Sequence, residues 1–462
     1  GEVCQKVFTK SVVCVIITIV ERIINARRFM VFFIKSKGTH LPDHRGHKEL
    51  TQDKPPFLFL NPEDVYIPLI EQGTPCEVKV KVGDKVKVGQ VIAERTDRFA
   101  IPIHASVSGE VVSVNQRMWH ASGRMVPCIH IKNDFQETKA ETIKPNKTDG
   151  LSRAEIIDIV RACGVVGLGG SGFPAYVKYK TDLPIDVVII NAVECEPYIT
   201  ADYAQMQKHL DEMLRGAEYI RRATDANRIV IAVKAYRKSL IEKIILRAGD
   251  KVSIYPVKDV YPAGWEKYLV QRITGKNYKG LPAEAGAVVN NSGTAIAVCH
   301  AVEDNMPLVE KTVTITGTGV KDPQNVYTKI GAKVSDIIAA LGGYAEELGD
   351  AYFIAGGPMT GVALKFDALV INRCLSSVVV MPKVIRELNP ECLGCGKCND
   401  VCPVFLAPIQ IKEALENDDL DLLKSYKPEL CMECGLCSYI CPSRIELTSN
   451  VARAKKKVLG SR

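Results

Sequence analysis

The chain has 462 residues, enough for several domains, and its 47% hydrophobic and 24% charged residues are typical of a globular protein. Its formal charge of +7 is scattered over 60 basic and 53 acidic residues, with no basic run interleaved with aromatic residues, which argues against nucleic-acid binding. Of its 16 cysteines, eight fall between Cys392 and Cys441, a clustering that indicates metal binding in a reducing compartment rather than a secreted disulfide scaffold.

The N-terminal segment contains an apolar run, residues 11–20, bracketed by Lys10 and Glu21. This run is too short to span a bilayer, which needs about 20 residues, and no small-residue cleavage site follows it. The first methionine is Met30, and we hypothesise that residues 1–29 are a non-native or upstream-derived extension. No other segment is expected to cross a membrane, so any membrane association would be peripheral or through partners.

Residues 65–133 alternate apolar and polar positions, which predicts β-structure. The two arms, VKVKVGDKVKVGQVIAE and IHASVSGEVVSV, resemble the barrel-sandwich hybrid domain of biotinyl and lipoyl carriers. The stretch RFAIPIHASVSG, at the place of the carriers' modified hairpin tip, contains no lysine. We therefore expect a structural β-domain and not a swinging arm.

After a polar linker, residues 133–150, the pattern is that of an α/β domain. A helix is predicted over 153–164, with Ser152 and Glu155 as a capping box. Buried strands are predicted at IDVVIINAV, RIVIAVKA and VSIYPV, separated by helical runs over 202–222 and 239–247. Strands that alternate with helices predict a mostly parallel sheet covered on both faces.

From about residue 311 the elements become shorter, and TVTITGTGV, VSDIIAALGG and AYFIAGGPMTG predict a small α+β module that resembles the β-grasp domain called SLBB. The last 75 residues are expected to be helical and rich in cysteine.

Residues 392–403, CLGCGKCNDVCP, and 431–442, CMECGLCSYICP, each have the spacing C-x2-C-x2-C-x3-C-P, which is typical of bacterial ferredoxins with [4Fe–4S] clusters. In two-cluster proteins the fourth cysteine of each run binds the other cluster. The predicted ligands are Cys392, Cys395, Cys398 and Cys441 for one cluster, and Cys431, Cys434, Cys437 and Cys402 for the other. Zinc is the alternative, because C-x2-C pairs also bind it, but zinc sites do not normally repeat this four-cysteine run.

The string GLGGSG, residues 167–172, matches the dinucleotide-binding pattern G-x-G-x-x-G. A Rossmann turn must follow a strand, whereas the segment before this loop is predicted to be helical, and Pro174 follows closely. The string is therefore not expected to be a Rossmann fingerprint. A structural glycine-rich turn is the simplest alternative.

GVVGLGGSGFPAYVK followed by NAVECEP resembles the flavin- and NADH-binding loops of the respiratory complex I flavoprotein subunit, GLRGRGGAGFPTGLK and NADEGEP. The directly matching residues are Gly164, Gly167, Gly169, Gly170, Gly172, Phe173, Pro174, Lys178, Asn191, Ala192, Glu194, Glu196 and Pro197. VNNSGTA resembles that family's INNVETLA, which implies flavin contacts from Asn290, Asn291 and Thr294, and YPAGWEKYL at the place of CGEETAL suggests Gly264 and Glu266. Phe173 is expected to stack on an adenine or nicotinamide ring, and Glu196 to orient NADH.

This sequence also departs from the complex I pattern. Two loop arginines are replaced by Val166 and Leu168, an aspartate by Val193 and a glycine by Cys195. Contacts to phosphate and to the flavin ring are therefore expected to differ in detail.

The order of these parts resembles the C subunits of Rnf complexes, which are ferredoxin:NAD+ oxidoreductases. KGTHLPDH resembles that family's N-terminal KGGxHPPxxK. The expected organisation is multidomain α/β and α+β, with the following ranges: N-terminal extension 1–29, barrel-sandwich hybrid domain 30–135, FMN/NADH-binding α/β domain 136–308, SLBB β-grasp domain 309–385, and helical two-[4Fe–4S] ferredoxin-like domain 386–462.

The resemblance implies an electron-transfer subunit that exchanges hydride with NAD(H) at FMN and single electrons at two [4Fe–4S] clusters. No side chain need act as a general acid or base. The implied partners are an iron–sulfur B-type subunit, integral flavoprotein and ion-translocating subunits that export Na+ or H+, and, indirectly, ferredoxin. The implied location is peripheral, at the cytoplasmic face of a bacterial membrane.

Two alternatives remain at this point. A soluble NADH-dependent cobalamin reductase of a microcompartment shares this set of domains. A polyferredoxin relay or scaffold whose front domains lack nucleotide binding is also compatible with the motifs.

Overall fold

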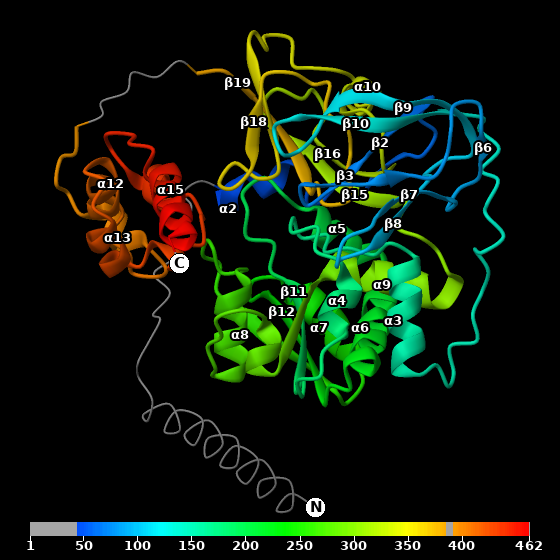
Figure 1. The fold of residues 1–462 in the computed structure, drawn as a ribbon, viewed down its shortest axis with the longest axis horizontal. Helices are drawn as coiled ribbons and strands as arrows, with labels where there is room; N and C mark the ends of the chain where they lie inside the picture. The colour runs from blue at the N-terminus through cyan, green and yellow to red at the C-terminus, as the bar shows by residue number, and fades with distance from the viewer. Residues whose placement is uncertain (1–43, 385–390, 462) are drawn as a thin grey trace, which may run out of the picture.

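The structure is a computed structural model that describes residues 44–384 and 391–461. The hypothesised extension, residues 1–29, lies outside the described residues. In Figure 1 the parallel sheet and its helices form the lower part of the main body, two further β-domains form the upper part, and the C-terminal helices lie to one side. No helix of the described part of the chain is long and apolar enough to span a membrane.

The first β-domain is a sandwich of two small antiparallel sheets, with strand orders β2-β10-β9-β6 and β5-β7-β8. Its strands are β2 Asp64–Pro68, β5 Glu77–Val78, β6 Lys85–Val86, β7 Val91–Arg95, β8 Ile101–His104, β9 Gly109–Trp119 and β10 Met125–Asn133, with a ribbon of β3 Ile70–Glu71 and β4 Thr74–Pro75. Ile92, Ile101 and Ile131 come from both sheets and are fully buried in one cluster. A side chain at Gly109 would meet the Lys132 carbonyl oxygen at 1.9 Å, so only glycine fits where β9 starts.

A four-stranded parallel sheet of order β13-β12-β11-β14 forms the centre of the second domain. Its strands are β11 Val187–Ala192, β12 Arg228–Lys234, β13 Val252–Val257 and β14 Ala287–Asn291. Val188 and Ile190 of β11 pack in the cluster under α3, α6, α7 and α9, whereas Val187 and Ile189 pack in the cluster under α8. Alternate residues thus face opposite layers, which explains the continuous apolar run of this strand.

The helices of this domain have the following bounds: α3 Arg153–Ala162, α4 Ala175–Tyr179, α5 Ala201–Lys208, α6 Leu210–Thr224, α7 Lys238–Arg247, α8 Glu266–Thr274, η2 Pro282–Ala285 and α9 Ser292–Asp304. The predicted capping box of α3 is confirmed, since Ser152 and Glu155 exchange both hydrogen bonds. The single helical run expected over 202–222 is wrong in one respect. His209 has φ −119° and ψ 39°, and this non-helical backbone divides the run into α5 and α6.

The third domain occupies the range expected for the β-grasp module and is called the β-grasp domain below. Its sheet is mixed, with six strands in the order β1-β16-β15-β19-β17-β18. Its elements are β15 Glu310–Thr316, β16 Gln324–Lys329, α10 Val334–Ala340, β17 Ala351–Ala355, β18 Val362–Leu364 and β19 Ser377–Pro382, together with β1 Phe57–Phe59. Strand β1 belongs to the range expected for the barrel-sandwich domain, yet it pairs in parallel with β16. The preceding turns, α2 His44–His47 and η1 Lys48–Leu50, lead the chain into this sheet.

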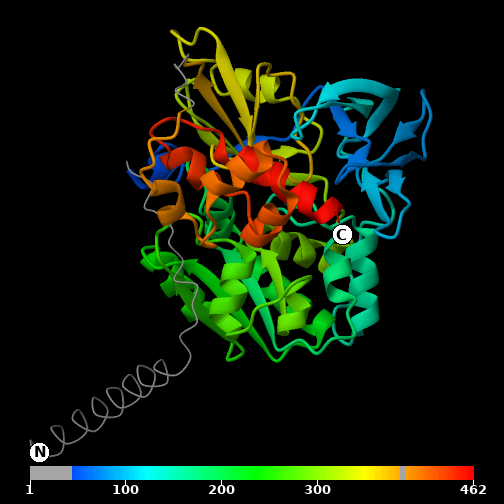
Figure 2. The same ribbon diagram turned by 60° about the vertical axis from the view of Figure 1, so that its left-hand side comes forward.

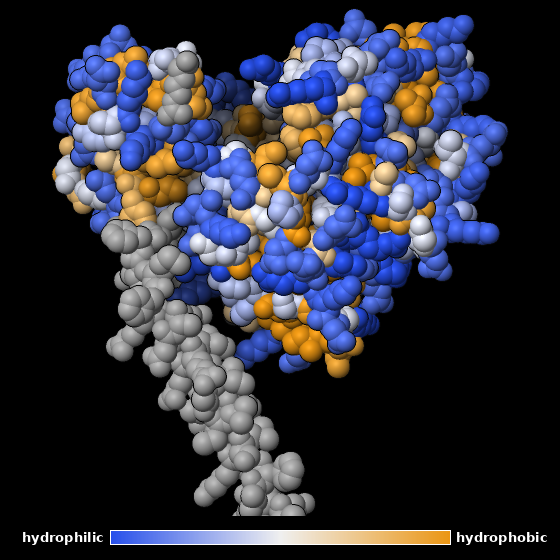
Figure 3. All heavy atoms as spheres, turned by 60° about the horizontal axis from the view of Figure 1, so that its bottom comes forward, coloured by the Kyte–Doolittle hydropathy of each residue, from blue (hydrophilic) through white to orange (hydrophobic). Residues whose placement is uncertain are grey.

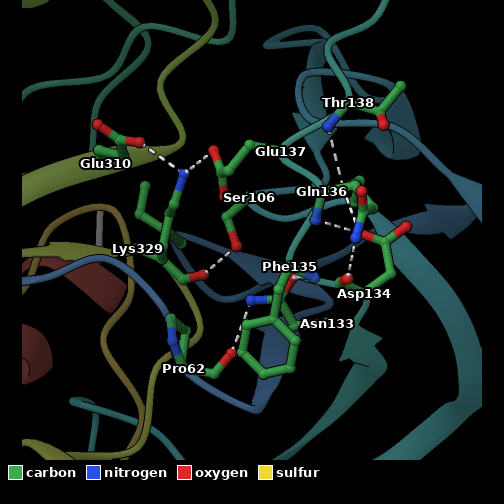
Figure 4. A network of polar contacts seen from close by, with 12 residues as sticks. Pro62, Ser106, Asn133, Asp134, Phe135, Gln136, Glu137, Thr138, Glu310 and Lys329 are labelled. Atoms are coloured by element: carbon green, nitrogen blue, oxygen red, sulfur yellow. Dashed lines mark hydrogen bonds and ion pairs between the residues drawn. The ribbon is translucent and has the colours of Figure 1, made fainter.

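A buried lysine links the two β-domains (Figure 4). The Lys329 side chain is 1% exposed, and its ammonium donates to Glu310 on β15 at 2.7 Å and to Glu137, beyond β10, at 2.8 Å. Close by, the Ser106 hydroxyl donates to the Ile330 carbonyl at 2.6 Å. The Glu137 and Ser106 contacts join segments that lie 192 and 224 residues apart in the chain and fix the two domains against each other.

The C-terminal domain is built from short helices around one small apolar core. Its elements are α11 Lys397–Val401, α12 Pro408–Glu416, α13 Leu420–Tyr426, η3 Pro428–Leu430, α14 Leu436–Ile440 and α15 Leu447–Gly460. In Figure 2 these helices lie in front of the junction between the parallel-sheet domain and the β-grasp sheet. The space-filling view shows them as a separate lobe, with a hollow between the lobe and the main body (Figure 3).

Candidate functional site

The carboxyl ends of β11 and β14 form a crevice. Open parallel α/β sheets generally bind ligands in a crevice at this place. The first strand of the sheet, β11, lies between β12 and β14, so the chain changes direction across the sheet at this point. Asn191 at the end of β11 is paired in register with Asn291 at the end of β14. The predicted site residues Glu194 and Glu196 follow Asn191 directly. The topology therefore brings together two sets of residues that are about 100 positions apart in the sequence.

The glycine-rich loop lies over this crevice. It follows helix α3, not a strand, so the Rossmann context is absent, as expected from the sequence. The backbone N–H of Leu168 donates to the Thr294 hydroxyl at 3.0 Å, and a side chain on Gly169 would contact Asn291 at 3.3 Å. The loop is thus held against the start of α9 at its Gly169 end.

A cavity of about 470 Å³ opens where this loop meets the two β-domains. Four of the predicted residues line it, namely Gly169, Gly170, Gly172 and Glu196. Opposite them lie residues 355–357 and 360–362 of the β-grasp domain and 67–68 and 70–73 of the barrel-sandwich domain. Its volume is in the range of small-molecule and cofactor pockets, about 300–1,000 Å³.

Glu196 is positioned by the β-grasp domain. Its carboxylate accepts hydrogen bonds from the Thr360 hydroxyl and, at 3.2 Å, from the Met359 N–H. Burial raises the pKa of Glu196, and the Thr360 and Met359 donors oppose that shift. A side chain on Gly357 would meet a Glu196 carboxylate oxygen at 2.2 Å, so glycine at 357 makes room for this carboxylate.

Behind the crevice lies a group of buried charges. The Asp202 and Tyr203 N–H groups donate to the Glu194 carboxylate at 2.8 and 3.4 Å, and the Asp202 carboxylate accepts from Asn291 Nδ2 at 2.6 Å. Burial and the neighbouring Glu194 carboxylate raise the pKa of Asp202 to about 7. Lys48 is 2% exposed, and burial lowers the pKa of its ammonium to about 8 although Glu194 opposes the shift.

Several predicted residues already have partners within the protein. Lys178 donates to the Val289 carbonyl at 2.9 Å and lies 3.7 Å from the Glu266 carboxylate. Asn191 Nδ2 donates to the Gly264 carbonyl at 2.7 Å. Lys178, Glu266 and Gly264 are therefore close to the crevice but do not line the large cavity.

The remaining predicted residues occupy the base and rim of the loop. Gly164 packs against the Arg373 guanidinium, and the Gly167 N–H bonds back to the Phe173 carbonyl at 2.8 Å. The Phe173 ring contacts the Phe99 ring edge-on, with 5.3 Å between the centroids. Phe99 comes from the barrel-sandwich domain, so this aromatic pair lies at a domain junction.

Two buried polar atoms at the end of β14 and the start of α9 could be satisfied by a bound ligand. Asn290 Nδ2 and Ser292 Oγ are buried and find no hydrogen-bond partner among the described residues. Unsatisfied buried amides are costly unless a ligand or water pairs with them. Asn191, Asn290, Asn291 and Thr294 could hold a flavin from the strand ends, while the glycine loop leaves room for a phosphate.

The C-terminal cysteines gather into two groups. Cys392, Cys395, Cys398 and Cys441 line one cavity of about 100 Å³. In the second group, burial raises the pKa of Cys434 to about 12, and the nearby thiols of Cys437, Cys431 and Cys402 add to this shift. Each group thus contains the fourth cysteine of the other run, the arrangement that the two-cluster pattern predicts.

The spacing of these thiols also bears on the metal. Four sulfurs around one zinc ion at about 2.3 Å would lie about 3.8 Å apart. Within the described residues, no three cysteine sulfurs lie within 4.8 Å of one another. No three described cysteine thiols are therefore grouped as closely as in a four-cysteine zinc site.

The second cysteine group packs directly onto the flavin crevice. The Tyr261 hydroxyl donates to the Cys434 carbonyl at 2.7 Å, and Tyr261, Cys434 and Leu436 form one buried cluster that also contacts Cys195 and Met359. By contrast, Cys392 and Cys395 of the first group are exposed. The second group is therefore the inner one.

Sequence reasoning missed four residues of this site, namely Lys48, Asp202, Tyr261 and Arg373. Arg373 is 5% exposed, lines the large cavity, and donates to the Gly164 carbonyl at 2.8 Å and to Glu71 at 2.9 Å. Tyr261 stands within the segment YPAGWEKYL, but nothing in the sequence indicates its distant partner.

Comparison with known proteins gives four family matches in chain order. The RnfC barrel sandwich hybrid domain matches residues 34–136, the Nuo51 FMN-binding domain 160–300, the SLBB domain 312–363 and the 4Fe-4S dicluster domain 391–445. The C subunit of the Na+-translocating ferredoxin:NAD+ oxidoreductase complex of Acetobacterium woodii is 35% identical over 92% of this chain and 97% of its own length. The chain belongs to the RnfC family.

Other members are similar over most of the chain. The C subunit of the proton-translocating ferredoxin:NAD+ oxidoreductase complex of Clostridium ljungdahlii is 34% identical over 80% of this chain and 82% of its own. The C subunit of the ion-translocating oxidoreductase complex of Rhodobacter capsulatus is 33% identical over 81% and 74%. A solved NAD+-reducing [NiFe]-hydrogenase chain has a TM-score of 0.48 at 17% identity over 68% of this chain and 62% of its own, too low to establish a common fold.

Family membership confirms the resemblance inferred from the order of the motifs. The four matches confirm the predicted fold class, and the FMN-binding and 4Fe-4S dicluster matches confirm FMN and iron–sulfur clusters as cofactors of this RnfC chain.

Proposed function

We propose that this chain exchanges hydride with NAD(H) at FMN and passes single electrons through two [4Fe–4S] clusters. The observation that carries the proposal is the contact between Tyr261 and Cys434, because it joins the flavin crevice to the inner cysteine group within one packed body. Electron transfer needs such proximity, and a scaffold without nucleotide binding does not.

We assign the following roles to the residues of the site. Asn191, Asn290, Asn291 and Thr294 hold the flavin, and Gly169 and Gly170 let phosphate groups approach the backbone. FMN bound here would supply the conversion between a two-electron hydride and single electrons, which matches the one-electron capacity of a cluster. Glu196 orients the nicotinamide nucleotide from the wall of the large cavity, and Phe173 stacks on one of its rings.

The cysteines of the two runs would hold the clusters that carry electrons between the crevice and the surface. Cys402, Cys431, Cys434 and Cys437 hold the inner cluster, next to the crevice. Cys392, Cys395, Cys398 and Cys441 would hold the outer cluster, and the exposed Cys392 and Cys395 would make it accessible to a partner. In this order, the two clusters would connect the crevice with the surface.

The relatives' names support a place in a larger assembly, since each is the C subunit of a complex that couples oxidoreduction to ion transport. We propose that an iron–sulfur B-type subunit receives or supplies electrons, that ferredoxin is the distant electron donor, and that integral flavoprotein and ion-translocating subunits hold this chain at the cytoplasmic face of the membrane. The coupled ion is Na+ in one relative and H+ in another by name.

The proposed domain ranges follow the sequence expectation, with one refinement. We propose that residues 30–135, 136–308, 309–385 and 386–462 are the functional units, and that strand β1 is contributed by the first range to the sheet of the third. The neighbouring segment, around Lys48, also completes the flavin crevice, where the Lys48 ammonium donates to the Glu196 carbonyl at 2.9 Å.

The experiment is anaerobic reduction of the cluster-loaded full chain by NADH. We expect flavin absorbance, NADH oxidation with an artificial acceptor, and paramagnetic reduced clusters. Glu196→Gln should raise the KM for NADH while the flavin and iron contents stay at wild-type values. Absence of flavin and of NADH oxidation would instead support the relay or scaffold alternative.

The cobalamin reductase alternative makes a different prediction. It requires reduction of cob(III)alamin by the isolated chain, and no integral membrane subunits should co-purify with it. Co-purification with such subunits from native membranes would support the complex proposed here.

A further inference from the structure

Two histidines and one glutamate meet on the helical face of the parallel-sheet domain, outside the large cavity and apart from the cysteine groups. His209 lies between α5 and α6, Glu212 lies in the first turn of α6, and His300 lies on α9. Their ligand atoms all lie within 4.8 Å of one another, and no other three His, Cys, Asp or Glu side chains of the described part of the chain do so. Imidazole nitrogens and a carboxylate oxygen at these distances are donors that can bind a metal ion.

The spacing suits a small divalent ion. His209 Nδ1 and Glu212 Oε1 are 3.1 Å apart, close to the distance of about 3.3 Å between two ligands of a tetrahedral ion with bonds of about 2.0 Å. The His300 ring meets the His209 ring edge-on, with the centroids 6.2 Å apart. The three ligand atoms lie within 4.8 Å of one another, so a small movement of the His300 side chain would bring it to ligand distance.

The chemistry of the donors selects the class of metal. Two imidazoles and one carboxylate favour zinc and its neighbours in the first transition series. Magnesium and calcium prefer sites made entirely of oxygen atoms. The His209 and Glu212 side chains are 24% and 29% exposed, so they are partly shielded from competing water and yet reachable by an ion.

There is also room for a further ligand. His209 and His300 line a cavity of about 90 Å³, enough for bound water. Leu308 separates it from the large cavity, since that residue lines both. Lys311 also lines the small cavity, but its ammonium donates to the Arg373 carbonyl at 2.8 Å. The ion would therefore have three protein ligands and one water-filled position.

We propose that His209, Glu212 and His300 bind one divalent transition-metal ion, with zinc as the reference ion. The site fastens the start of α6 to the middle of α9, two helices that pack side by side (Figure 1). Helix α9 begins at the residues expected to hold the flavin, so the ion would brace that helix from its far side. This proposal is independent of the redox function, because it concerns helix packing.

The test is calorimetric titration of the anaerobically purified full chain, treated with chelator and still containing its iron and flavin, with zinc chloride. We expect saturable binding of one equivalent, no comparable binding of magnesium, and an unchanged iron content. His300→Gln and Glu212→Gln should each weaken zinc binding at least tenfold. Zinc should also raise the thermal unfolding midpoint of the wild-type chain but not of these variants.

His130→Gln is the matched control. His130 Nε2 lies 2.6 Å from the Asp64 carboxylate, so it also forms a histidine–carboxylate pair, but no third ligand among the described residues completes it. Its zinc binding should equal that of the wild type. Zinc binding that is non-saturable, or equal in the wild type, His300→Gln and Glu212→Gln, would overturn the proposal. If His300→Gln does not fold, Glu212→Gln, which retains both rings, decides the matter.

Discussion

The Tyr261 hydroxyl donates a 2.7 Å hydrogen bond to the Cys434 carbonyl, across 173 positions of sequence. Both residues are buried, at 3% and 9% exposure. Because Cys434 belongs to the inner cysteine group, this bond fixes the distance between that group and the crevice at the end of β11. A side chain on Gly435, the next residue, would meet the Met359 carbonyl oxygen at 2.5 Å, so the turn also packs tightly on the β-grasp domain that holds Glu196.

Tyr261→Phe should weaken the packing of the inner cysteine group on the crevice without unfolding the protein. The change leaves the Cys434 carbonyl without its donor, at a cost of about 1 kcal/mol, or about fivefold in the docking equilibrium. Reduction of the clusters by NADH, followed by paramagnetic resonance, should slow, while NADH oxidation by an artificial acceptor at the flavin should not change. Tyr344→Phe, which removes a 2.7 Å bond to Asp367 far from this contact, is the control. Equal cluster reduction in the two variants would contradict the role of Tyr261.

Gly170→Ala should reduce flavin or nucleotide binding, because the new methyl group would project into the large cavity. Gly170 has φ +99° and lines that cavity, and a Cβ at this position would have no protein atom within 4 Å. Gly150→Ala is a matched control, since Gly150 has φ +84° and equally open surroundings but lies in the linker. Both variants should lose about 1 kcal/mol of stability from the backbone conformation. Only Gly170→Ala should lose cofactor affinity, measured by flavin retention and by NADH titration.

Cys402→Ser should remove the inner cluster, although Cys402 belongs to the first cysteine run. Iron and sulfide should fall to about half of the wild-type values. The pairing can be tested with double variants. Cys402→Ser combined with Cys431→Ser should retain the same half, whereas Cys402→Ser combined with Cys392→Ser should lose nearly all the iron. Cys374→Ser, outside both runs, should retain the full content.

The parts of this site that could be predicted from the sequence are local. Each cysteine run and the glycine loop lie within about a dozen consecutive residues. Their patterns can therefore be recognised in the sequence, and they indicate clusters and a nucleotide-binding loop. Tyr261 with Cys434, and Asp202 with Asn291, could not be predicted, because such contacts depend on how distant elements pack. The position of strand β1 could not be predicted for the same reason. Its three apolar residues carry no pairing signal of their own, yet they join a sheet whose other strands begin at Glu310.

Lys329→Met should destabilise the junction of the two β-domains by about 3 kcal/mol, because it leaves the Glu310 carboxylate, 19% exposed, without its cation. The loss should appear as a lower denaturant midpoint, followed by the fluorescence of Trp119 and Trp265. Lys383→Met is the control. Its partner Asp350 is 85% exposed at 3.4 Å, so the change should cost less than about 1 kcal/mol. Equal midpoints for the two variants would show that the buried ion pairs do not hold the domains together.

Asp202→Asn should change the pH dependence of stability in a defined direction. Burial and Glu194 raise the pKa of Asp202 to about 7, so the folded protein keeps a proton that the unfolded chain releases near pH 4. The stabilising contribution of this proton is fully present below about pH 4 and is lost as the pH rises to about 7, with a slope of at most about 1.4 kcal/mol per pH unit. Asparagine does not titrate, and its amide oxygen can still accept from Asn291 Nδ2. The stability of the variant relative to the wild type should therefore rise between pH 5.5 and about 7 and level off above it, as measured by thermal unfolding midpoints. Parallel curves for the two proteins over that interval would mean that Asp202 is already ionised at pH 5.5 and that its contact with Asn291 is a charged one.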